Sequence, residues 1–367
     1  MQQLIGPNPY MNVPVPSLVM PEAGQCNYSC VRKEFHRASQ TERNNYIWAI
    51  RKLMESNGNS YSPWEQLSKE HFTYASLNHN SKSFYPWHRL YLARIEATLQ
   101  KIDPSVCLLY WDWSYESQNW KQSQIWSENM LGMGGVGSTQ CISGPFADIR
   151  LKTATHPSGC ISRGFGTSVF YATAYLSQAH QQYNTYQDWE EYWEVNPHAV
   201  IHRYVGGDMQ TQYSPNDPLF YLHHGTVDLY WWKFQGKLAA LQKPQYGGLT
   251  NGEPVSLDDV LVPYPNKVKT MMEIKDFCYS YDILEQAPET NIKQPQIPVD
   301  FLKNNGFTDA QIHKLSTSSN FNDNAISNAM NNNITQIPAP TSAPSAKKSN
   351  SSVSMLSVLW LVLVYLL

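Results

Sequence analysis

The histidines of this chain are the residues whose spacing most clearly indicates chemistry. Imidazole nitrogen binds copper and zinc, so histidines that recur at short intervals are candidate metal ligands. Seven of the eleven histidines fall into two such groups: His71, His79 and His88, followed by His198, His202, His223 and His224. The other four stand alone, and we expect them to be ordinary surface or core residues: His36, His156, His180 and His313.

One pair in the second group has a spacing that suits a shared metal ion. His198 and His202 are four residues apart in a stretch with a helical pattern, so both rings lie on one helix face. Zinc proteases use the same spacing, but they carry a glutamate after the first histidine, where this chain has Ala199. The sequence therefore disfavours a protease. Three neutral nitrogens per metal suit copper, whereas carboxylates and thiolates favour other ions.

The elements that must position these histidines are read from helical patterns between start and stop signals. Such patterns predict helices over residues 39–56, 87–102, 188–204 and 219–235. The strongest signals are the capping box from Ser39 to Glu42 and the helix start at Asp217-Pro218. The stretch 113–167 is rich in glycine, serine and tryptophan and predicts loops. We therefore expect a mainly α fold with long loops.

Composition divides the 367 residues into segments. Residues 26–283 form the expected folded domain, and a proline-rich extension over 1–25 precedes it. The segments that follow are a short, partly helical extension over 284–315, an Asn/Ser/Pro linker expected to be disordered over 316–352, and an apolar tail over 353–367. The net charge is only −3 and the basic residues are scattered, so we expect no nucleic-acid partner.

The apolar tail bears on localisation. It is short for a membrane-spanning helix and follows a polar spacer over 341–352, a layout typical of a GPI-anchor signal. A tail anchor or a buried C-terminal helix is the alternative. Six cysteines favour disulfides whose pairing stays open, and glycosylation sequons occur at Asn27, Asn333 and Asn350. We expect a secreted or cell-surface protein anchored to the membrane through the tail, although residues 1–25 carry no signal-peptide pattern.

Two long motifs resemble the copper signatures of the tyrosinase and catechol oxidase family, whose type-3 binuclear copper site is shared by haemocyanin units. Residues 79–96 (HNSKSFYPWHRLYLARIE) resemble the first signature, and residues 217–228 (DPLFYLHHGTVD) resemble the second. Shorter matching pieces occur in the same order at 110–113, 206–209 and 279–281. The resemblance covers roughly residues 26–283, which is the whole of the expected folded domain.

The resemblance implies a fold and a set of ligands. In the family, a mainly helical domain with a central antiparallel four-helix bundle presents the ligands of two copper ions. Carried over position by position, the ligands of the first copper are His71, His79 and His88. Those of the second copper are His198, His202 and His224. His223, the first residue of the doublet, is then a neighbour of the site and not a ligand.

Two departures from the family pattern affect the chemistry. Leu77 stands where some members carry a cysteine that bonds to the second histidine, so no such link forms here. Ala199 replaces an asparagine that, in many hydroxylating members, helps to hold a water molecule that deprotonates the phenol. The acidic partner for that water is one of three residues whose register stays open: Glu190, Glu191 and Glu194. The second departure favours diphenol oxidation over monophenol hydroxylation.

Other residues are expected around the site. Asp228, one turn beyond His224, is placed to orient a ligand or to pair with a cation. Three aromatic residues are expected to be core residues that also line the site: Phe84, Phe220 and Tyr221. In several family members a C-terminal extension covers the copper site and keeps the enzyme latent. Here we expect little cover, with Phe301 or Phe307 as the residues that could reach the pocket.

The resemblance thus implies a copper oxidoreductase that uses dioxygen to oxidise phenolic small molecules, chiefly o-diphenols to o-quinones. Monophenol hydroxylation would be an added activity, and the products suit melanin formation or phenol cross-linking. The alternative from another class is a haemocyanin-like oxygen carrier, which a single domain with an anchor tail fits poorly. A latent or structural copper protein is a further alternative, and its structural form, with a degenerate site, is disfavoured because all six ligand positions hold histidine.

Overall fold

The computed structural model describes residues 5–25, 28–56, 58, 60–283, 295, 299–304, 308–310 and 312–313. These residues all belong to one of the two units into which the chain divides, residues 1–329. The expected linker, the apolar tail with its anchor, the three sequons and Phe307 lie outside the described residues. Among the described residues, no helix is both long and apolar enough to span a membrane.

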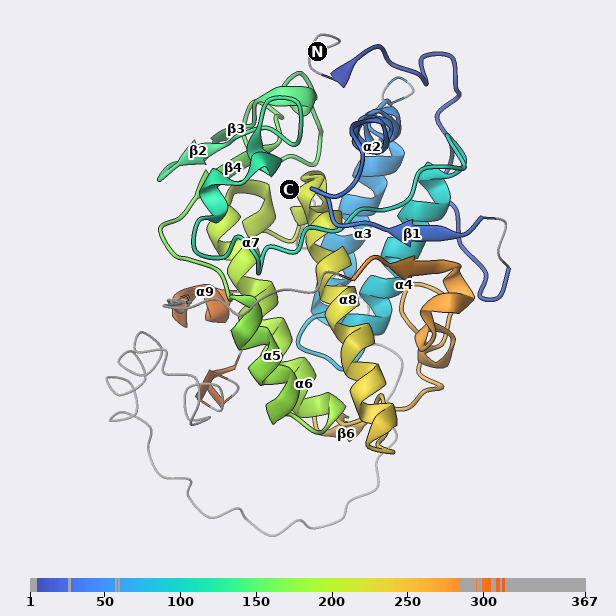
Figure 1. Ribbon diagram of the computed structural model, residues 1–367, viewed down its shortest axis with the longest axis vertical. Helices are drawn as coiled ribbons and strands as arrows, with labels where there is room; N and C mark the ends of the chain where they lie inside the picture. Colours follow the sequence, from blue (N-terminus) through green and yellow to red (C-terminus); the bar gives the residue numbers. More distant parts are fainter. Residues whose placement is uncertain are drawn as a thin grey trace, which may run out of the picture. The chain divides into compact units, whose positions relative to one another are not determined.

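Helices dominate the fold (Figure 1). In chain order they are α2 (Gln40–Leu53), α3 (Pro63–Asn78), α4 (Phe84–Leu99), α5 (Thr173–Gln182), α6 (Tyr186–Trp193), α7 (Ala199–Val205), α8 (Leu219–Ala240) and α9 (Val299–Asn304). The central bundle consists of α3, α4, α8 and the run from α6 to α7, and α4 packs along α8. The prediction of a mainly α fold with a central four-helix bundle and long loops is confirmed.

The helix starts explain which predictions succeeded. The capping box of α2 is present, with Ser39 and the Glu42 side chain each accepting from the other's backbone N–H. Helix α3 was not predicted, yet it starts with the same device, a capping box between Ser62 and Glu65 with Pro63 in the first turn. In α8, the Asp217 carboxylate accepts from the Leu219 N–H at 2.9 Å.

The stretch expected to be one helix over 188–204 is built from three pieces. Helix α6 leads into a π-helical turn, Glu194–His198, which contains Pro197 and continues into α7. Because proline has no N–H to donate, the turn widens there. The run ends at Gly206, whose φ is +68°, and a Cβ at this position would lie 2.4 Å from the carbonyl oxygen of Gly164. Only glycine fits this stop.

Three small sheets tie down the loops. Strands β1 (Cys30–Arg32) and β7 (Tyr279–Tyr281) pair in parallel, although they lie near opposite ends of the domain's sequence. In the loop-rich stretch, β4 (Ser162–Phe165) lies between β2 (Gly135–Val136) and β3 (Gln140–Cys141), and a hairpin joins β5 (Leu249–Thr250) to β6 (Glu253–Pro254). The β1–β7 pair brings both ends of the domain to the back of the helices that carry the histidines.

Disulfides add covalent ties, as the cysteine content predicted. Cys30 is bonded to Cys107, which joins β1 to the segment after α4. Cys141 is bonded to Cys160 within the β2–β4–β3 region, and Cys278 is also disulfide-bonded. Disulfides of this kind are typical of secreted and extracellular proteins.

Candidate metal centre

Each histidine group comes from helices that meet at the centre of the bundle. In the first group, His71 lies within α3, His79 is the C-cap of α3, and His88 lies in the first turns of α4. The ligand nitrogens of these three residues lie within 4.8 Å of one another. In the second group, His198 ends the π-helical turn, His202 lies in α7, and the doublet lies in α8. Their nitrogens also lie within 4.8 Å of one another.

Backbone carbonyls fix the orientation of five of these rings. The Nδ1–H groups donate to the carbonyl oxygens as follows: His71 to Gln212 at 2.7 Å, His79 to Ala75 at 3.1 Å, His88 to Phe84 at 2.8 Å, His198 to Glu194 at 2.9 Å and His202 to Met209 at 2.6 Å. A carbonyl oxygen can only accept, so each of these rings carries its proton on Nδ1. The Nε2 lone pair of each ring is therefore free to bind a metal ion.

Several of the Nε2 atoms that converge here lack hydrogen-bond partners. Those of His71, His88 and His198 are buried and have no partner among the described residues. The Nε2 atoms of His202 and His224 lie only 3.4 Å apart. An unpaired buried polar atom costs about 1–3 kcal/mol, and a cluster of them calls for an explanation. Metal ligation accounts for all of them, since a nitrogen-only donor set fits copper.

Burial also keeps the rings in the state that binds a metal. Burial lowers the pKa of His79 to about 4 and that of His202 to about 4. For the other four imidazoles, burial lowers the pKa well below the ordinary value and neighbouring histidines contribute: His71, His88, His198 and His224. All six imidazoles are thus neutral at pH 7, as metal binding requires.

The two groups adjoin, and two phenylalanines pack between their rings. The rings of His88 and His224 stack with centroids 4.4 Å apart. Phe84 lies 4.5 Å from His88 and 4.9 Å from the second-group His198. Phe220 lies 4.2 Å from His224 and 5.2 Å from His71. Both phenylalanines are therefore core residues that line the centre, as expected.

The spacing of the doublet does not show which of its two histidines is the metal ligand. His223 is fully buried, stacks on His198 at 5.3 Å, and both its ring nitrogens lack a hydrogen-bond partner among the described residues. His224 instead lies between the groups, because its ring stacks on His88 of the first group and its Nε2 contacts that of His202 in the second. Its position between the groups is the one that a ligand of a binuclear centre needs.

A cavity opens onto the centre from one side. It encloses about 450 Å³ of empty space, the open solvent at its mouth included. Four of the histidines line it: His71, His79, His198 and His202. His88 and His224 are not among the lining residues and lie beneath them. Phe301 of α9 also lines the cavity, so one of the two extension residues expected to reach the pocket does so.

Comparison with known proteins shows which family this chain resembles. Residues 58–237 match the family model of the common central domain of tyrosinase. Tyrosinase of Streptomyces antibioticus is 30% identical over 226 residues, which cover 56% of this chain and 81% of that protein. The chain belongs to the tyrosinase family. The tyrosinase-like protein phomQ1′ of Diaporthe leptostromiformis is 29% identical over 307 residues, covering 70% of this chain and 81% of that protein.

Solved structures share the fold. A point mutant of a polyphenol oxidase from Thermothelomyces thermophila superposes with a TM-score of 0.55 at 20% identity, covering 70% of this chain and 89% of that one. A functional unit of octopus haemocyanin superposes with a TM-score of 0.51 at 20% identity, covering 70% of this chain and 68% of the other. Both likenesses establish the fold of this tyrosinase-family domain.

The three candidate acids of the tyrosinase-like site are in different environments. Glu194 alone supplies a carboxylate among the described residues that line the cavity, and its Oε1 accepts from the Asn80 N–H at 2.8 Å. Burial, helped by the charge of Glu190, raises the pKa of Glu194 well above its usual range. Glu190 and Glu191 instead accept from the ammonium group of the buried Lys82, at 2.6 and 3.0 Å. Neither of them lines the cavity.

Asp228 supports both groups from behind. Its carboxylate pairs with Arg89 at 2.6 Å and accepts from the hydroxyls of Tyr279 and Tyr281, each at 2.6 Å. Arg89 follows His88 in α4, and Asp228 lies one turn beyond His224 in α8. The charges of Arg89 and Arg32 lower the pKa of Asp228 against the opposing effect of burial. Of the two roles expected for Asp228, the structure shows the pairing with a cation.

The remaining predicted residues lie away from the cavity. Tyr221 stacks near Trp64 and Tyr91 in the core, with centroids at 4.8 and 6.0 Å. His180 is enclosed by aromatic rings, and burial lowers its pKa to about 3. His156 lies 3.9 Å from the disulfide-bonded Cys141. The other two lone histidines are half-buried His36 and exposed His313.

Several residues of the site were not predicted from the sequence. Ser62 and Pro63 start the helix that carries His71, and their signal was present in the sequence. Met209 and Gln212 orient two histidines through their carbonyl oxygens. No side-chain type signals such a role, because any residue supplies a carbonyl oxygen.

Proposed function

We propose that this chain is a binuclear copper oxidase that uses dioxygen to convert o-diphenols to o-quinones. One observation carries the proposal: six neutral imidazoles converge, five of them with Nδ1 held by a backbone carbonyl so that Nε2 faces inward. Two groups of three nitrogens, stacked against each other, form a donor set for two copper ions side by side.

The chain's residues have distinct roles in this proposal. The first copper is held by His71, His79 and His88, and the second by His198, His202 and His224. When bound, the pair of copper ions supplies the two-electron redox chemistry with dioxygen that phenol oxidation needs. Phe84 and Phe220 pack against the rings and keep bulk water from the space between the groups. The carbonyl contacts hold the rings in one orientation throughout turnover.

The substrate proposed for the cavity is a small phenol. The opening lies beside four ligand rings, and Met209 and Phe301 offer apolar contact to an aromatic ring. Next to His198, Ala199 presents only a methyl group to the cavity. Glu194 is the proposed acceptor of the phenolic proton, through a water molecule, because among the three candidate acids it alone lines the cavity. With alanine in place of asparagine, that water is held less firmly, which favours diphenols over monophenols.

Oxygen uptake by the copper-loaded chain tests the proposal. We expect two copper ions per chain, rapid uptake with a simple catechol, and slower uptake with a monophenol. Reversible oxygen binding by a two-copper protein that consumes neither substrate would instead establish a carrier. A chain that binds no copper at neutral pH would contradict the metal site itself.

A matched pair of variants tests the role of Glu194. We expect Glu194→Gln to slow monophenol oxidation about 100-fold while changing catechol oxidation only a few-fold, because general-base catalysis contributes on that scale. Glu191→Gln is the control, since Glu191 bonds to Lys82 and does not line the cavity. Equal losses in both variants would show that the whole acidic cluster, and not Glu194, controls the reaction.

We further propose that the protein acts at the cell surface. The disulfides support passage through an oxidising compartment, and the apolar run 353–367 behind a polar spacer supports a GPI anchor. Quinones made there would serve pigment formation or cross-linking of phenols. Release of activity from cells by a phosphatidylinositol-specific phospholipase tests the anchor. Activity that stays with the membrane would point to a spanning tail.

A further inference from the structure

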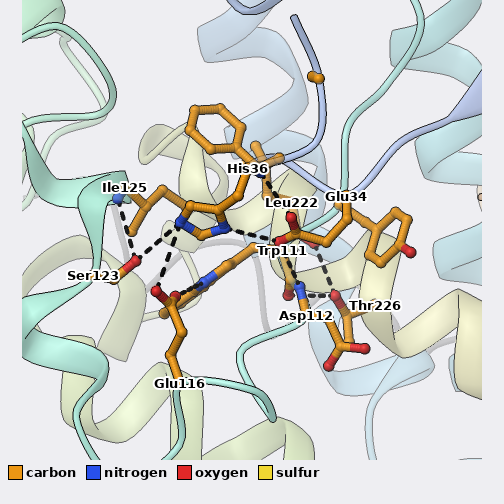
Figure 2. Close-up of polar contacts among 12 residues, drawn as sticks. Glu34, His36, Trp111, Asp112, Glu116, Ser123, Ile125, Leu222 and Thr226 are labelled. Carbon is orange, nitrogen blue, oxygen red and sulfur yellow. Dashed lines mark hydrogen bonds and ion pairs between the residues drawn. The ribbon is translucent and has the colours of Figure 1, made fainter. Parts of the chain in front are cut away.

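His36, which belongs to neither histidine group, lies between two carboxylates (Figure 2). Its Nδ1 is 3.1 Å from Oε1 of Glu34, and its Nε2 is 3.7 Å from Oε1 of Glu116. The Ser123 hydroxyl is 3.3 Å from the same Nε2. His36 is 28% exposed and Glu34 only 5%, so the group lies at the edge of the core.

Other contacts hold both carboxylates in place. Oε2 of Glu34 accepts from the backbone N–H of His36 at 2.7 Å. Oε2 of Glu116 accepts from the indole N–H of Trp111 at 2.9 Å. Each carboxylate therefore presents its other oxygen to the imidazole ring. The Nδ1–H group can donate to Glu34 in either charge state of the ring, whereas only the charged ring also forms an ion pair with Glu116 through Nε2.

Charges on three elements act on His36. Burial lowers the pKa of His36, but the hydrogen bond and charge of Glu34 and the charge of Glu116 outweigh it, so the pKa is raised. Arg43 of α2 opposes this rise, and its guanidinium donates to the backbone oxygen of His36. The balance keeps the ring charged to a higher pH than an isolated histidine.

The contacts continue from His36 to the helix that carries the histidine doublet. Trp111, which Glu116 holds by its indole, is fully buried. Its backbone N–H donates to the carbonyl oxygen of Leu222 at 3.1 Å. Its carbonyl oxygen accepts from the Thr226 hydroxyl at 2.5 Å. Figure 2 shows these contacts from His36 as far as Leu222 and Thr226. These two residues flank His224 in α8, so the path ends beside a residue of the metal centre.

We propose that charged His36 is a positioning residue for α8. Its ion pair with Glu116 fixes Trp111, and Trp111 in turn holds the part of α8 that carries His224; we call this set of contacts the clamp. The inference rests on the proposed copper site only for its effect on metal retention. Because the clamp needs the charged ring, it is complete below the ordinary histidine pKa of about 6.5. It is lost as the pH rises through the raised pKa of His36 in the folded protein. The second half of the centre is then held less firmly in mildly alkaline solution.

The test compares His36→Gln with the parent chain between pH 6.5 and 8.5. We expect the variant's melting temperature, measured without metal, to be about 1–3 °C lower at pH 6.5 and equal to the parent's at pH 8.5. Amide exchange over residues 222–228, taken as the ratio of variant to parent at each pH, should be about 2–5-fold faster at pH 6.5 only. Copper release to a chelator should follow the same pattern.

Two further variants make the result specific. Glu116→Gln keeps an acceptor for the Trp111 indole but loses the charge, so it should reproduce His36→Gln. His156→Gln is the matched control, because the His156 ring bonds to Ser158 on the far loop, and it should leave every ratio at one. A deficit in His36→Gln that is equal at both pH values would overturn the charged clamp. A stability loss with unchanged exchange in α8 would overturn the link to His224.

If the chain binds no copper, the copper proposal fails while the melting and exchange measurements still decide the clamp. If copper binds and the exchange ratio stays at one, the clamp fails while the copper site stands. The two proposals are thus separated by the same set of samples.

Discussion

The two histidine groups present the same donors by different local structures. In the first, α3 supplies His71 from its interior and His79 from its C-cap, where the backbone has already turned extended. In the second, His198 and His202 lie one turn apart across the junction of a π-helical turn and α7. The first group therefore depends on a helix end and its loop, and its His79 is partly exposed, whereas the second is internal to helices.

The difference shows that the two groups do not need the same local motif to form one site. What they share is the support behind their rings. Both groups place one ring beneath the cavity, His88 from α4 and His224 from α8. These two rings stack, and directly behind them Arg89 pairs with Asp228. The groups thus differ where they line the cavity and are alike at the base, where His88 and His224 lie.

The largest effect is expected from the ligands at the base. His88→Gln and His224→Gln should each lower the copper content from two ions to one per chain and reduce catechol oxidation by more than about 100-fold, because removing a direct ligand should cost at least as much as removing its orienting partner. Copper analysis of the purified variants measures this. His223→Gln should keep two ions, since its ring stacks on His198 away from the first group. Loss of copper in His223→Gln with retention in His224→Gln would reverse the assignment within the doublet.

The next effect concerns the support that both groups share. Arg89→Met leaves Asp228 buried beside Arg32 with its closest partner removed, so we expect a loss of about 3–5 kcal/mol in the free energy of unfolding. Denaturant unfolding of the metal-free chain measures it. The double variant Arg89→Met, Asp228→Leu should recover part of the loss, because no unpaired carboxylate is left. Copper should leave both sites of Arg89→Met; release from one site alone would show that the groups have separate supports.

Much of this base, and less of the cavity, could be predicted from the sequence. The long signatures contain His88, Arg89, His224 and Asp228, so the base followed from local patterns within two helices. The cavity was harder because its geometry depends on distant contacts. The carbonyl oxygen of Gln212 orients His71 across 141 residues, and such a contact leaves no trace in residue type. Which glutamate faces the cavity depends on the π-helical turn, whose rotation the sequence pattern does not show.

Other features of the fold that were not predicted from the sequence also have specific physical causes. Helix α3 was overlooked although Ser62, Pro63 and Glu65 announce its start, because its apolar spacing is irregular. The pairing of β1 with β7 joins segments about 250 residues apart, and three-residue strands carry no usable alternation. The sequence does not predict the disulfide pairing either, because six cysteines allow many different pairings.

Acid should unfold the metal-free chain through its buried imidazoles. The folded pKa of His202 is about 4, below the ordinary value, so the unfolded chain binds protons that the folded chain excludes. The stability contribution is full above about pH 6.5 and is lost as the pH falls towards 4, by about 3 kcal/mol for such a shift. His202→Gln should flatten the fall in melting temperature over this range. His79→Gln should flatten it by a similar amount, because burial lowers the folded pKa of His79 to about 4 as well. Flattening by only one of the two variants would show that the two groups exclude protons unequally.

The smallest effect separates a helix that carries ligands from one that does not. Ser39→Ala and Ser62→Ala each remove the side-chain acceptor of a capping box, at a cost of about 1 kcal/mol of stability. Because α3 carries His71 and ends at His79, Ser62→Ala should also weaken copper binding at the first group, about 2–5-fold in chelator competition. Ser39→Ala should leave copper affinity unchanged, since α2 supplies no ligand. If both variants weaken copper binding equally, the metal centre responds to global stability, and the dependence of the first group on one helix is wrong.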